Sequence, residues 1–425
     1  MPEYNQERKT IILKPFNELR VEVDFGKKYF VKLKTGFAEL FGAELGKQNE
    51  YEFSGNKFAI FSYEGCELEI SHCSSEYTAS TTPMNSYMNL HLALQNRRNL
   101  AKKNNQIGPR LLVLGSSDSG KSTLCRILAN YAIRSFEAPI VINLDPANGM
   151  VTVPGTISAT KFSHTINPID GFMSHGVVNS SGLIDQPLVF YYGYNSVSEY
   201  PALFKSVVNN LAKILFKQLE LNPKEKESGF IIDTFGNINP SDYHIVDNII
   251  SSLQVDTILV VGNEKLYNDF TKKYQDNSLI SIASVQKSGG VVNCDLRFLK
   301  NIQNDIIKKY FHGCDSEKLQ SFSTALRISE TGLFKIGQDS LAPSSTLPLG
   351  ETRKVSETQI SQVTIDERVQ HMIIGVSQLD LPEATKSEKN AAIKQEPDLN
   401  ELPLLEYNVQ EESVLASPIL GFLNV

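Results

Sequence analysis

The chain has 425 residues and a formal net charge of −7 at pH 7; 41% of its residues are hydrophobic and 21% are charged. This balance is typical of a soluble globular protein, and the length predicts two or three domains. The negative charge argues against broad, non-specific binding of a nucleic-acid backbone, although it allows a local basic groove. No apolar run has the length of a signal peptide core at the N-terminus or of a membrane span elsewhere. We therefore expect neither secretion nor contact with a membrane.

The first 80 residues are predicted to form β structure. Residues 19–25, 30–34 and 66–70 alternate apolar and polar side chains, and residues 58–61 form a short apolar run. Glycine-containing turns separate these segments at short intervals. A small antiparallel sandwich or barrel is the fold that this pattern favours.

A helix is predicted over residues 83–105, where apolar side chains recur at helical spacing. Two basic pairs lie near its end, Arg97-Arg98 and Lys102-Lys103. We interpret them as a solvated helix face rather than as an RNA contact. The polar segment that follows predicts a domain boundary just before Arg110.

A phosphate-binding loop is the strongest functional signal in the sequence. An apolar strand at 111–114 runs into a segment of the form GxxxxGKS at 115–122, and residues 123–129 continue at helical spacing. The two glycines let the backbone wrap around phosphates with its N–H groups turned inward, at the positive end of a helix dipole. Lys121 can reach the β and γ phosphates, and the Ser122 hydroxyl can ligate Mg²⁺. We therefore predict a nucleotide-binding protein.

Around this loop, strands and helices alternate between residues 110 and 312. Apolar strands at 139–145, 229–233 and 257–261 and a helix at 204–219 predict a mostly parallel sheet covered on both faces.

Asp145 and Asp233 each end one of these strands, on the side where such folds bind ligands. Either carboxylate could organise Mg²⁺, Asp233 through water, and either could instead cap the following turn.

The remainder of the chain carries a weaker pattern. Alternation over 354–376 and an apolar run over 414–422 predict a small β-rich domain, and the polar segment 383–401 is expected to be a mobile insertion. The predicted fold is thus α/β, with a central P-loop sheet flanked by a small N-terminal all-β domain and a small C-terminal β-rich domain. The predicted domains are residues 1–107, including the trailing helix, 108–314 and 315–425.

Five cysteines are scattered along the chain without a CxxC pair or a ligand-like cluster. They are Cys66, Cys73, Cys125, Cys294 and Cys314. This usage predicts free thiols in a reducing compartment and no cysteine-bound metal.

Several short motifs carry a family resemblance. In chain order they are Tyr63-Glu64-Gly65-Cys66, Thr82-Pro83-Met84, Gly108-Pro109-Arg110, the P-loop, Val153-Pro154-Gly155-Thr156, residues 287–292 and residues 310–313. With these motifs the chain resembles the eukaryotic RNA 5′-hydroxyl polynucleotide kinase family. Within that family it is similar to the cleavage-factor subunits of the pre-mRNA 3′-end cleavage and polyadenylation machinery, in particular the fungal cleavage-factor IA form.

The resemblance implies ATP and Mg²⁺ as cofactors and a set of residues that hold them. Glu18 and Lys57 match the positions where the N-terminal domain touches the adenine and ribose side of ATP. Asp118, Ser119, Gly120, Lys121, Ser122 and Thr123 match the loop around the phosphates. Ser122 and Asp145 match the Mg²⁺ positions, and Asp145 is the candidate catalytic residue.

The chain departs from the active kinases at four places. It has Asp145-Pro146-Ala147-Asn148-Gly149 where they have DxGQG, and residues 193–198 where they have a Thr-Pro-Gly clasp. Asn237 stands where they place a Trp that stacks on RNA, and the chain contains no Trp. The lid segment 298–309, rich in arginine in active enzymes, contains only lysines as basic residues. Lysine lacks the bidentate fork with which arginine holds a phosphoryl group.

These departures favour an ATP-bound scaffold without kinase activity over a working RNA 5′-hydroxyl kinase, the alternative. A GTPase is disfavoured because residues 261–265 contain no NKxD-like motif. The resemblance further implies partners among the other cleavage and polyadenylation subunits, including the scaffold subunit that binds the RNA polymerase II tail. It also implies indirect contact with RNA and residence in the nucleus.

Overall fold

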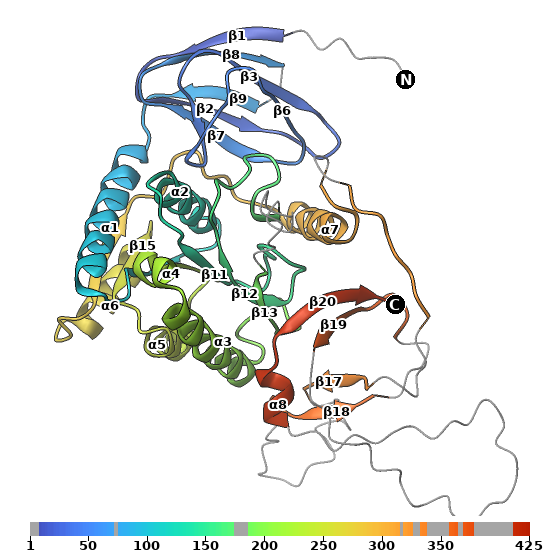
Figure 1. Cartoon of the computed structure of the whole chain (residues 1–425). Helices are drawn as coiled ribbons and strands as arrows, with labels where there is room; N and C mark the ends of the chain where they lie inside the picture. Colours follow the sequence, from blue (N-terminus) through green and yellow to red (C-terminus); the bar gives the residue numbers. More distant parts are fainter. Residues whose placement is uncertain are drawn as a thin grey trace, which may run out of the picture.

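The computed structural model describes residues 8–71, 75–173, 186–314, 318–325, 332–337, 357–363, 369–377 and 411–425. An N-terminal β-sandwich lies above a central α/β layer, and the last strands of the chain pack beside that layer (Figure 1). Within the described residues no helix is both long and apolar enough to cross a membrane.

Two antiparallel sheets form the N-terminal domain, with strand orders β1-β8-β3-β6 and β5-β4-β7-β2-β9. Their strands are β1 (Arg8–Leu13), β2 (Asn17–Glu22), β3 (Tyr29–Gly36), β4 (Glu39–Leu40), β5 (Ala43–Glu44), β6 (Glu50–Phe53), β7 (Lys57–Ser62), β8 (Cys66–Ser71) and β9 (Ser75–Ala79). The alternating apolar side chains meet between the sheets, where Leu19, Val31 and Leu68 are fully buried. The predicted sandwich is confirmed.

The central sheet has seven strands in the order β13-β12-β11-β14-β10-β15-β16. These are β10 (Arg110–Gly115), β11 (Ile140–Leu144), β12 (Thr156–Lys161), β13 (Leu188–Tyr191), β14 (Phe230–Thr234), β15 (Thr257–Val261) and β16 (Ser281–Val285). The five neighbouring strands β11, β14, β10, β15 and β16 are parallel to one another. Strand β12 pairs antiparallel with β11, and β13 pairs antiparallel with β12. The mostly parallel sheet predicted from the sequence is therefore confirmed.

Helices cover both faces of this sheet. Leu111 and Val113 of β10 pack in one core with α1 (Met84–Asn104) and α2 (Lys121–Arg134). Leu112 and Leu114 pack in the opposite core. That core includes side chains of α3 (Pro201–Leu221), α5 (Tyr243–Ser252) and α6 (Glu264–Tyr274). Shorter helices are α4 (Pro223–Ser228) and a 3-10 turn, η2 (Pro240–Asp242).

The basic pairs on α1 are not a uniform solvated face, as the sequence had suggested. Arg98 is 1% exposed and donates to the Ser228 backbone oxygen at 2.9 Å. Arg97 pairs with Asp256 at 2.9 Å, whereas Lys103 is exposed. The prediction is wrong for Arg98 because α4 packs over that side of α1.

The C-terminal residues form two small β pairs, one of β17 (Phe334–Ile336) and β18 (Ile360–Gln362) and one of β19 (Ile373–Ser377) and β20 (Ile419–Asn424). The strand predicted over 414–422 is wrong in its first half, because α8 (Glu411–Ala416) precedes β20. Pro418, which lacks a backbone N–H, separates the two. The segment 383–401 and Cys73 lie outside the described residues.

One long helix, α7 (Leu296–His312), runs between the sandwich and the C-terminal strands (Figure 1). Near its start Phe298 contacts Phe25 of the sandwich, with ring centroids 5.2 Å apart. Near its end Tyr310 contacts Phe422 of β20, with centroids 5.7 Å apart. The helix therefore connects the two flanking domains across the edge of the central layer.

Candidate nucleotide-binding site

The P-loop connects the end of β10 to the start of α2. Gly120 has φ of 88°, in the left-handed region that glycine adopts without strain. A Cβ atom on Gly115 would lie 2.8 Å from the Val261 backbone oxygen. Both glycines of the motif are thus required by the backbone, which confirms the predicted strand, loop and helix.

Inside the loop, two groups are suited to an anion. Lys121 is 7% exposed, and its Nζ donates to the Ser116 backbone oxygen at 2.8 Å. The Ser119 hydroxyl is buried and has no hydrogen-bond partner among the described residues. Buried polar groups are normally paired, so an acceptor supplied by a ligand, such as a phosphate oxygen, fits this position.

Two carboxylates lie beside the loop, as the strand ends predicted. Asp145 accepts from the backbone N–H of Ala147 at 3.2 Å and from Asn148 Nδ2 at 3.0 Å. Asp233 is 2% exposed, and its Oδ1 has no partner in the described part of the chain. Burial raises the pKa of Asp233 to about 6, although the Ser122 hydroxyl and Lys121 act in the opposite direction. Carboxylate and hydroxyl oxygens of this kind fit Mg²⁺.

The sandwich supplies the opposite wall of the site. Glu18 is 2% exposed and accepts from Arg20 Nε at 2.6 Å and from Thr82 Oγ1 at 2.7 Å. The Lys57 ammonium lies 4.7 Å from the centroid of the Phe298 ring. The second contact places Lys57 beside the start of α7, whereas the hydrogen bonds of Glu18 stay within the N-terminal part of the chain.

A cavity of about 910 Å³ brings all the predicted site residues together. Its lining includes Glu18, Lys57, Asp118, Ser119, Gly120, Lys121, Ser122, Thr123, Asp145 and Asp233. The predicted residues therefore share one site, and their roles as ligands of ATP and Mg²⁺ stay predictions.

Arg126 also lines this cavity, and the sequence analysis missed it. Its guanidinium carbon lies 4.2 Å from the Phe41 ring centroid, and it donates to the Asn167 backbone oxygen. The signal was present in the spacing, because Arg126 follows Ser122 by four residues and so lies on the same side of α2.

Comparison with known proteins matches three family models to three successive parts of the chain. The family model described as mRNA cleavage and polyadenylation factor CLP1 P-loop matches residues 115–313. The N-terminal beta-sandwich domain of polyadenylation factor matches residues 12–101, and pre-mRNA cleavage complex II protein Clp1 matches residues 319–425. The mRNA cleavage and polyadenylation factor clp1 of Botryotinia fuckeliana is 34% identical over 385 residues, which cover 89% of this chain and 83% of the relative.

The chain belongs to the Clp1 family. A second Clp1 relative, polyribonucleotide 5′-hydroxyl-kinase Clp1 of Danio rerio, is 33% identical over 365 residues, covering 85% of this chain and 80% of the relative. A solved structure of a wild-type Clp1p–Pcf11p complex superimposes with a TM-score of 0.80 at 24% identity, covering 99% of this chain and 91% of the other. That likeness supports the three-part Clp1 fold.

The departures from the active kinases fall on the same cavity. Its walls include residues 195–198, where the resemblance implies a clasp, and Asn237, where it implies a stacking Trp. From α7 it is lined by Phe298, Leu299, Ile302, Gln303, Asp305, Ile306 and Lys309. The helix also contains Arg297, but that residue is not part of the lining. The α7 wall is thus mainly apolar or neutral where a lid would stabilise a transferring phosphoryl group.

The raised pKa of Asp233 predicts a pH-dependent effect on stability. A carboxylic acid whose pKa is higher in the folded state retains its proton there, so stability falls as pH rises from about 4 through 6. In nucleotide-free protein, Asp233→Asn is expected to raise the free energy of unfolding by about 2–3 kcal/mol at pH 8. At pH 5 this gain in the free energy of unfolding should be about 1 kcal/mol smaller than at pH 8. Urea unfolding at both pH values measures it, and a gain that grows toward pH 5 contradicts this assignment.

Proposed function

We propose that this chain is an ATP-binding scaffold subunit of the pre-mRNA 3′-end cleavage and polyadenylation machinery, and that it holds ATP as a structural ligand without transferring its phosphate. One observation carries the proposal. The cavity combines a complete P-loop with two adjacent carboxylates, yet its α7 wall carries no arginine. Loss of an arginine that stabilises the transferring group reduces phosphoryl transfer by on the order of 10³–10⁵-fold.

The position of the cavity supports a structural role for the nucleotide. Its walls come from the sandwich, through Glu18 and Lys57, and from the central domain, through Lys121 and Asp145. A ligand that touches both walls favours the assembled form of the two domains. Because it binds only the folded state, it stabilises the protein in proportion to the logarithm of its concentration relative to its Kd.

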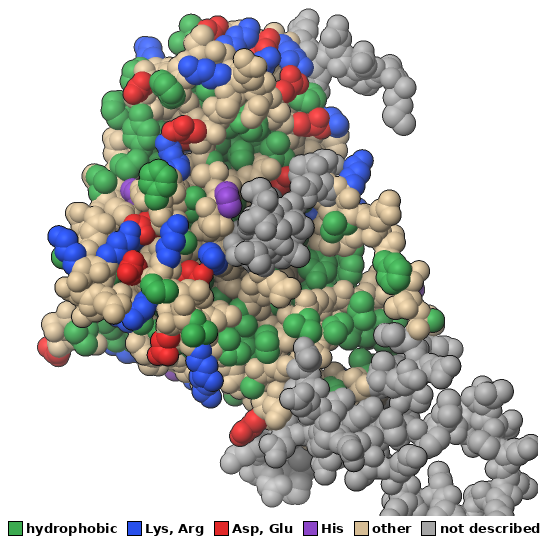
Figure 2. Space-filling view, viewed as in Figure 1, with side chains coloured by type: hydrophobic (Ala, Val, Ile, Leu, Met, Phe, Trp, Pro, Cys, Tyr) green, Lys and Arg blue, Asp and Glu red, His purple; other side chains and the backbone are tan. Residues whose placement is uncertain are grey.

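The partners follow from the family. Relatives are named as mRNA cleavage and polyadenylation factors, and a structural neighbour is a complex of Clp1p with Pcf11p. We infer that this chain likewise binds such a cleavage-factor subunit and works in the nucleus. Basic and acidic side chains are interspersed on the face drawn in Figure 2, a distribution that favours contact with RNA through partner proteins.

A working RNA 5′-hydroxyl kinase is the second candidate function. The name of the zebrafish relative, a polyribonucleotide 5′-hydroxyl-kinase, favours it. In that reaction Lys121 would hold the transferring phosphate, and Asp145 would orient Mg²⁺ and the attacking hydroxyl.

One experiment separates the two functions. Purified protein is denatured, the released nucleotide is identified by ion-exchange chromatography, and native protein is incubated with γ-labelled ATP and a 5′-hydroxyl oligoribonucleotide. We expect close to one ATP per chain and no more label transfer than Lys121→Ala gives. Robust transfer that Lys121→Ala abolishes would instead establish the kinase.

A further inference from the structure

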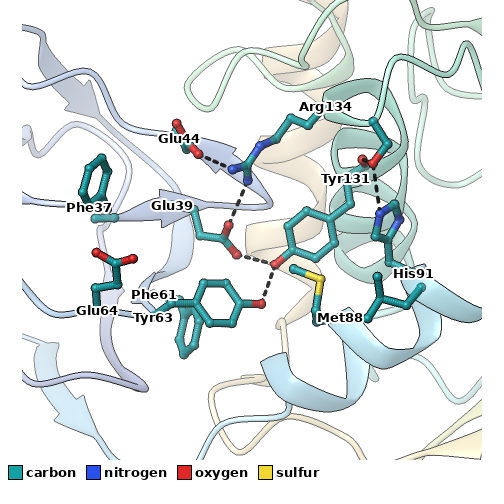
Figure 3. A pocket seen from close by; sticks show the side chains of 13 residues that line it. Phe37, Glu39, Glu44, Phe61, Tyr63, Glu64, Met88, His91, Tyr131 and Arg134 are labelled. Carbon is teal, nitrogen blue, oxygen red and sulfur yellow. Dashed lines mark hydrogen bonds and ion pairs between the residues drawn. The ribbon is translucent and has the colours of Figure 1, made fainter. Parts of the chain in front are cut away.

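A second cavity, of about 570 Å³, lies between the sandwich, α1 and α2, away from the P-loop end of α2 (Figure 3). Glu39 and Tyr63 line it from the sandwich, Met88 and His91 from α1, and Tyr131 from α2. None of the nucleotide-site residues predicted from the sequence lines it. Its side chains therefore require their own explanation.

A polar network closes the inner wall of this cavity (Figure 3). Arg134 donates to Glu39 at 3.2 Å and also pairs with Glu44. The Tyr131 hydroxyl donates to Glu39 and lies 3.2 Å from the Tyr63 hydroxyl. Arg134 is thus neutralised within the network by two carboxylates.

The cavity as a whole is acidic. Three carboxyl groups, those of Glu39, Glu44 and Glu64, line it, against Arg134 in the lining and Lys47 over the Phe37 ring at its edge. His91 adds no positive charge at pH 7, because burial lowers its pKa to about 4. Glu64 is exposed at the rim, and the interactions found among the described residues include no hydrogen bond or ion pair from its side chain.

Aromatic side chains supply the rest of the surface. Phe37, Phe61, Tyr63 and Tyr131 line the cavity, and Phe37 is 57% exposed at its edge. Leu92, also in the lining, is 52% exposed. Two of these rings already have a cation of this chain nearby. Lys47 lies 4.9 Å from the Phe37 ring centroid, and Arg134 lies 6.0 Å from the Tyr131 ring centroid.

One buried polar atom of a lining residue has no partner among the described residues, and it belongs to His91. His91 is 6% exposed, and its Nε2 lies 3.2 Å from the Ser135 hydroxyl. Its Nδ1 is buried and has no hydrogen-bond partner among the described residues. A neutral imidazole nitrogen in this setting can accept a hydrogen bond from an N–H donor of a ligand.

We propose that this cavity is a docking site for an arginine side chain carried by an extended segment of a partner protein. A guanidinium group is planar, stacks on aromatic rings and presents several N–H donors, so it suits a site of aromatic walls, unpaired acceptors and excess carboxylate. The same carboxylates would repel the phosphates of RNA, so a nucleic acid is disfavoured here. The partner would add its charge beside Glu64, whose side chain has no hydrogen bond or ion pair among the described residues.

This site is independent of the proposed nucleotide role but is physically connected to it. Glu39 and Phe61 line both cavities, and α2 runs from Lys121 at the P-loop to Arg134 in the network. The experiment therefore measures binding at the second cavity itself. It does not require that ATP be bound or hydrolysed.

The experiment uses the full chain with isotope-labelled methionine methyl groups, observed by NMR. Met88 lies in the lining, and the signal lost in Met88→Leu identifies it. The probes are three acetylated, amidated peptides of sequence Ser-Xaa-Leu-Ser, in which Xaa is arginine, its uncharged analogue citrulline, or glutamate. We expect a saturable Met88 shift with the arginine peptide and at least fivefold weaker binding of the citrulline peptide.

Variants at the rim of the cavity test whether the carboxylate of Glu64 contributes to binding of the arginine peptide. Glu64→Gln is expected to weaken the arginine peptide about two- to fivefold, an effect of about 0.5–1 kcal/mol for an exposed pair. Glu220→Gln on α3, an exposed carboxylate on the opposite side of the sheet, is the matched control and should leave binding unchanged. Absence of a saturable Met88 shift, equal binding of the citrulline peptide, or a shift produced only by an oligoribonucleotide would each overturn the proposal.

Discussion

Replacing Lys121 with alanine is expected to release the bound nucleotide and to lower the melting temperature of the protein by roughly 10 °C. The substitution itself removes one hydrogen bond to the Ser116 backbone oxygen, worth about 1 kcal/mol. The larger effect is the lost ligand, since ATP present at about 1,000 times its Kd stabilises the folded state by about 4 kcal/mol. For domains of this size each kcal/mol corresponds to roughly 2–4 °C. Scanning calorimetry and nucleotide extraction measure both effects.

The matched control for this substitution is Lys217→Ala, an exposed lysine on α3. It should retain nucleotide and melt with the wild-type protein. After nucleotide is stripped from both proteins, wild type and Lys121→Ala should melt within about 4 °C of each other. If the wild-type protein carries no ATP and the substitution leaves the melting temperature unchanged, the structural-ligand function is wrong.

Asn130→Ala is expected to destabilise the protein by about 2–5 kcal/mol. It should also weaken the interface between the sandwich and the central domain. Asn130 of α2 is fully buried. Its Nδ2 donates to the Phe41 backbone oxygen at 2.8 Å, and its Oδ1 accepts from the Ile166 backbone N–H at 2.8 Å. Alanine leaves both backbone groups buried without a partner, at about 1–3 kcal/mol each. Denaturant unfolding measures the loss.

This domain interface also borders the candidate nucleotide cavity, because Phe41 and Arg126 both line that cavity. Asn130→Ala should therefore retain less ATP after purification than the wild-type protein. Asn89→Ala, at an exposed position of α1, is the control and should change neither stability nor ATP content. A variant at position 130 with wild-type stability would mean that water or a neighbouring side chain replaces both hydrogen bonds.

Much of the candidate nucleotide site could be predicted because its signals are local in the sequence. The GxxxxGKS loop, the strand before it and the helix after it occupy adjacent residues, and each has its own periodicity. Asp145 and Asp233 end apolar strands, and the rule that parallel strands present ligands at their carboxyl ends places both near Lys121. The match of Glu18 and Lys57 came from the family resemblance, and no local pattern distinguished them from ordinary surface charges.

The sequence by itself thus determined the β-sandwich, the parallel sheet and the phosphate loop of this protein, because those features depend on residues close together in the chain. Only the tertiary structure decided that Arg98 is buried under α4, that Arg126 borders the nucleotide cavity and that Arg134 pairs with Glu39, which lies 95 residues earlier. The physical reason is that periodicity fixes which face of an element is buried. The packing of whole domains then chooses which polar side chains meet across that face, and nothing in the neighbouring residues records that choice.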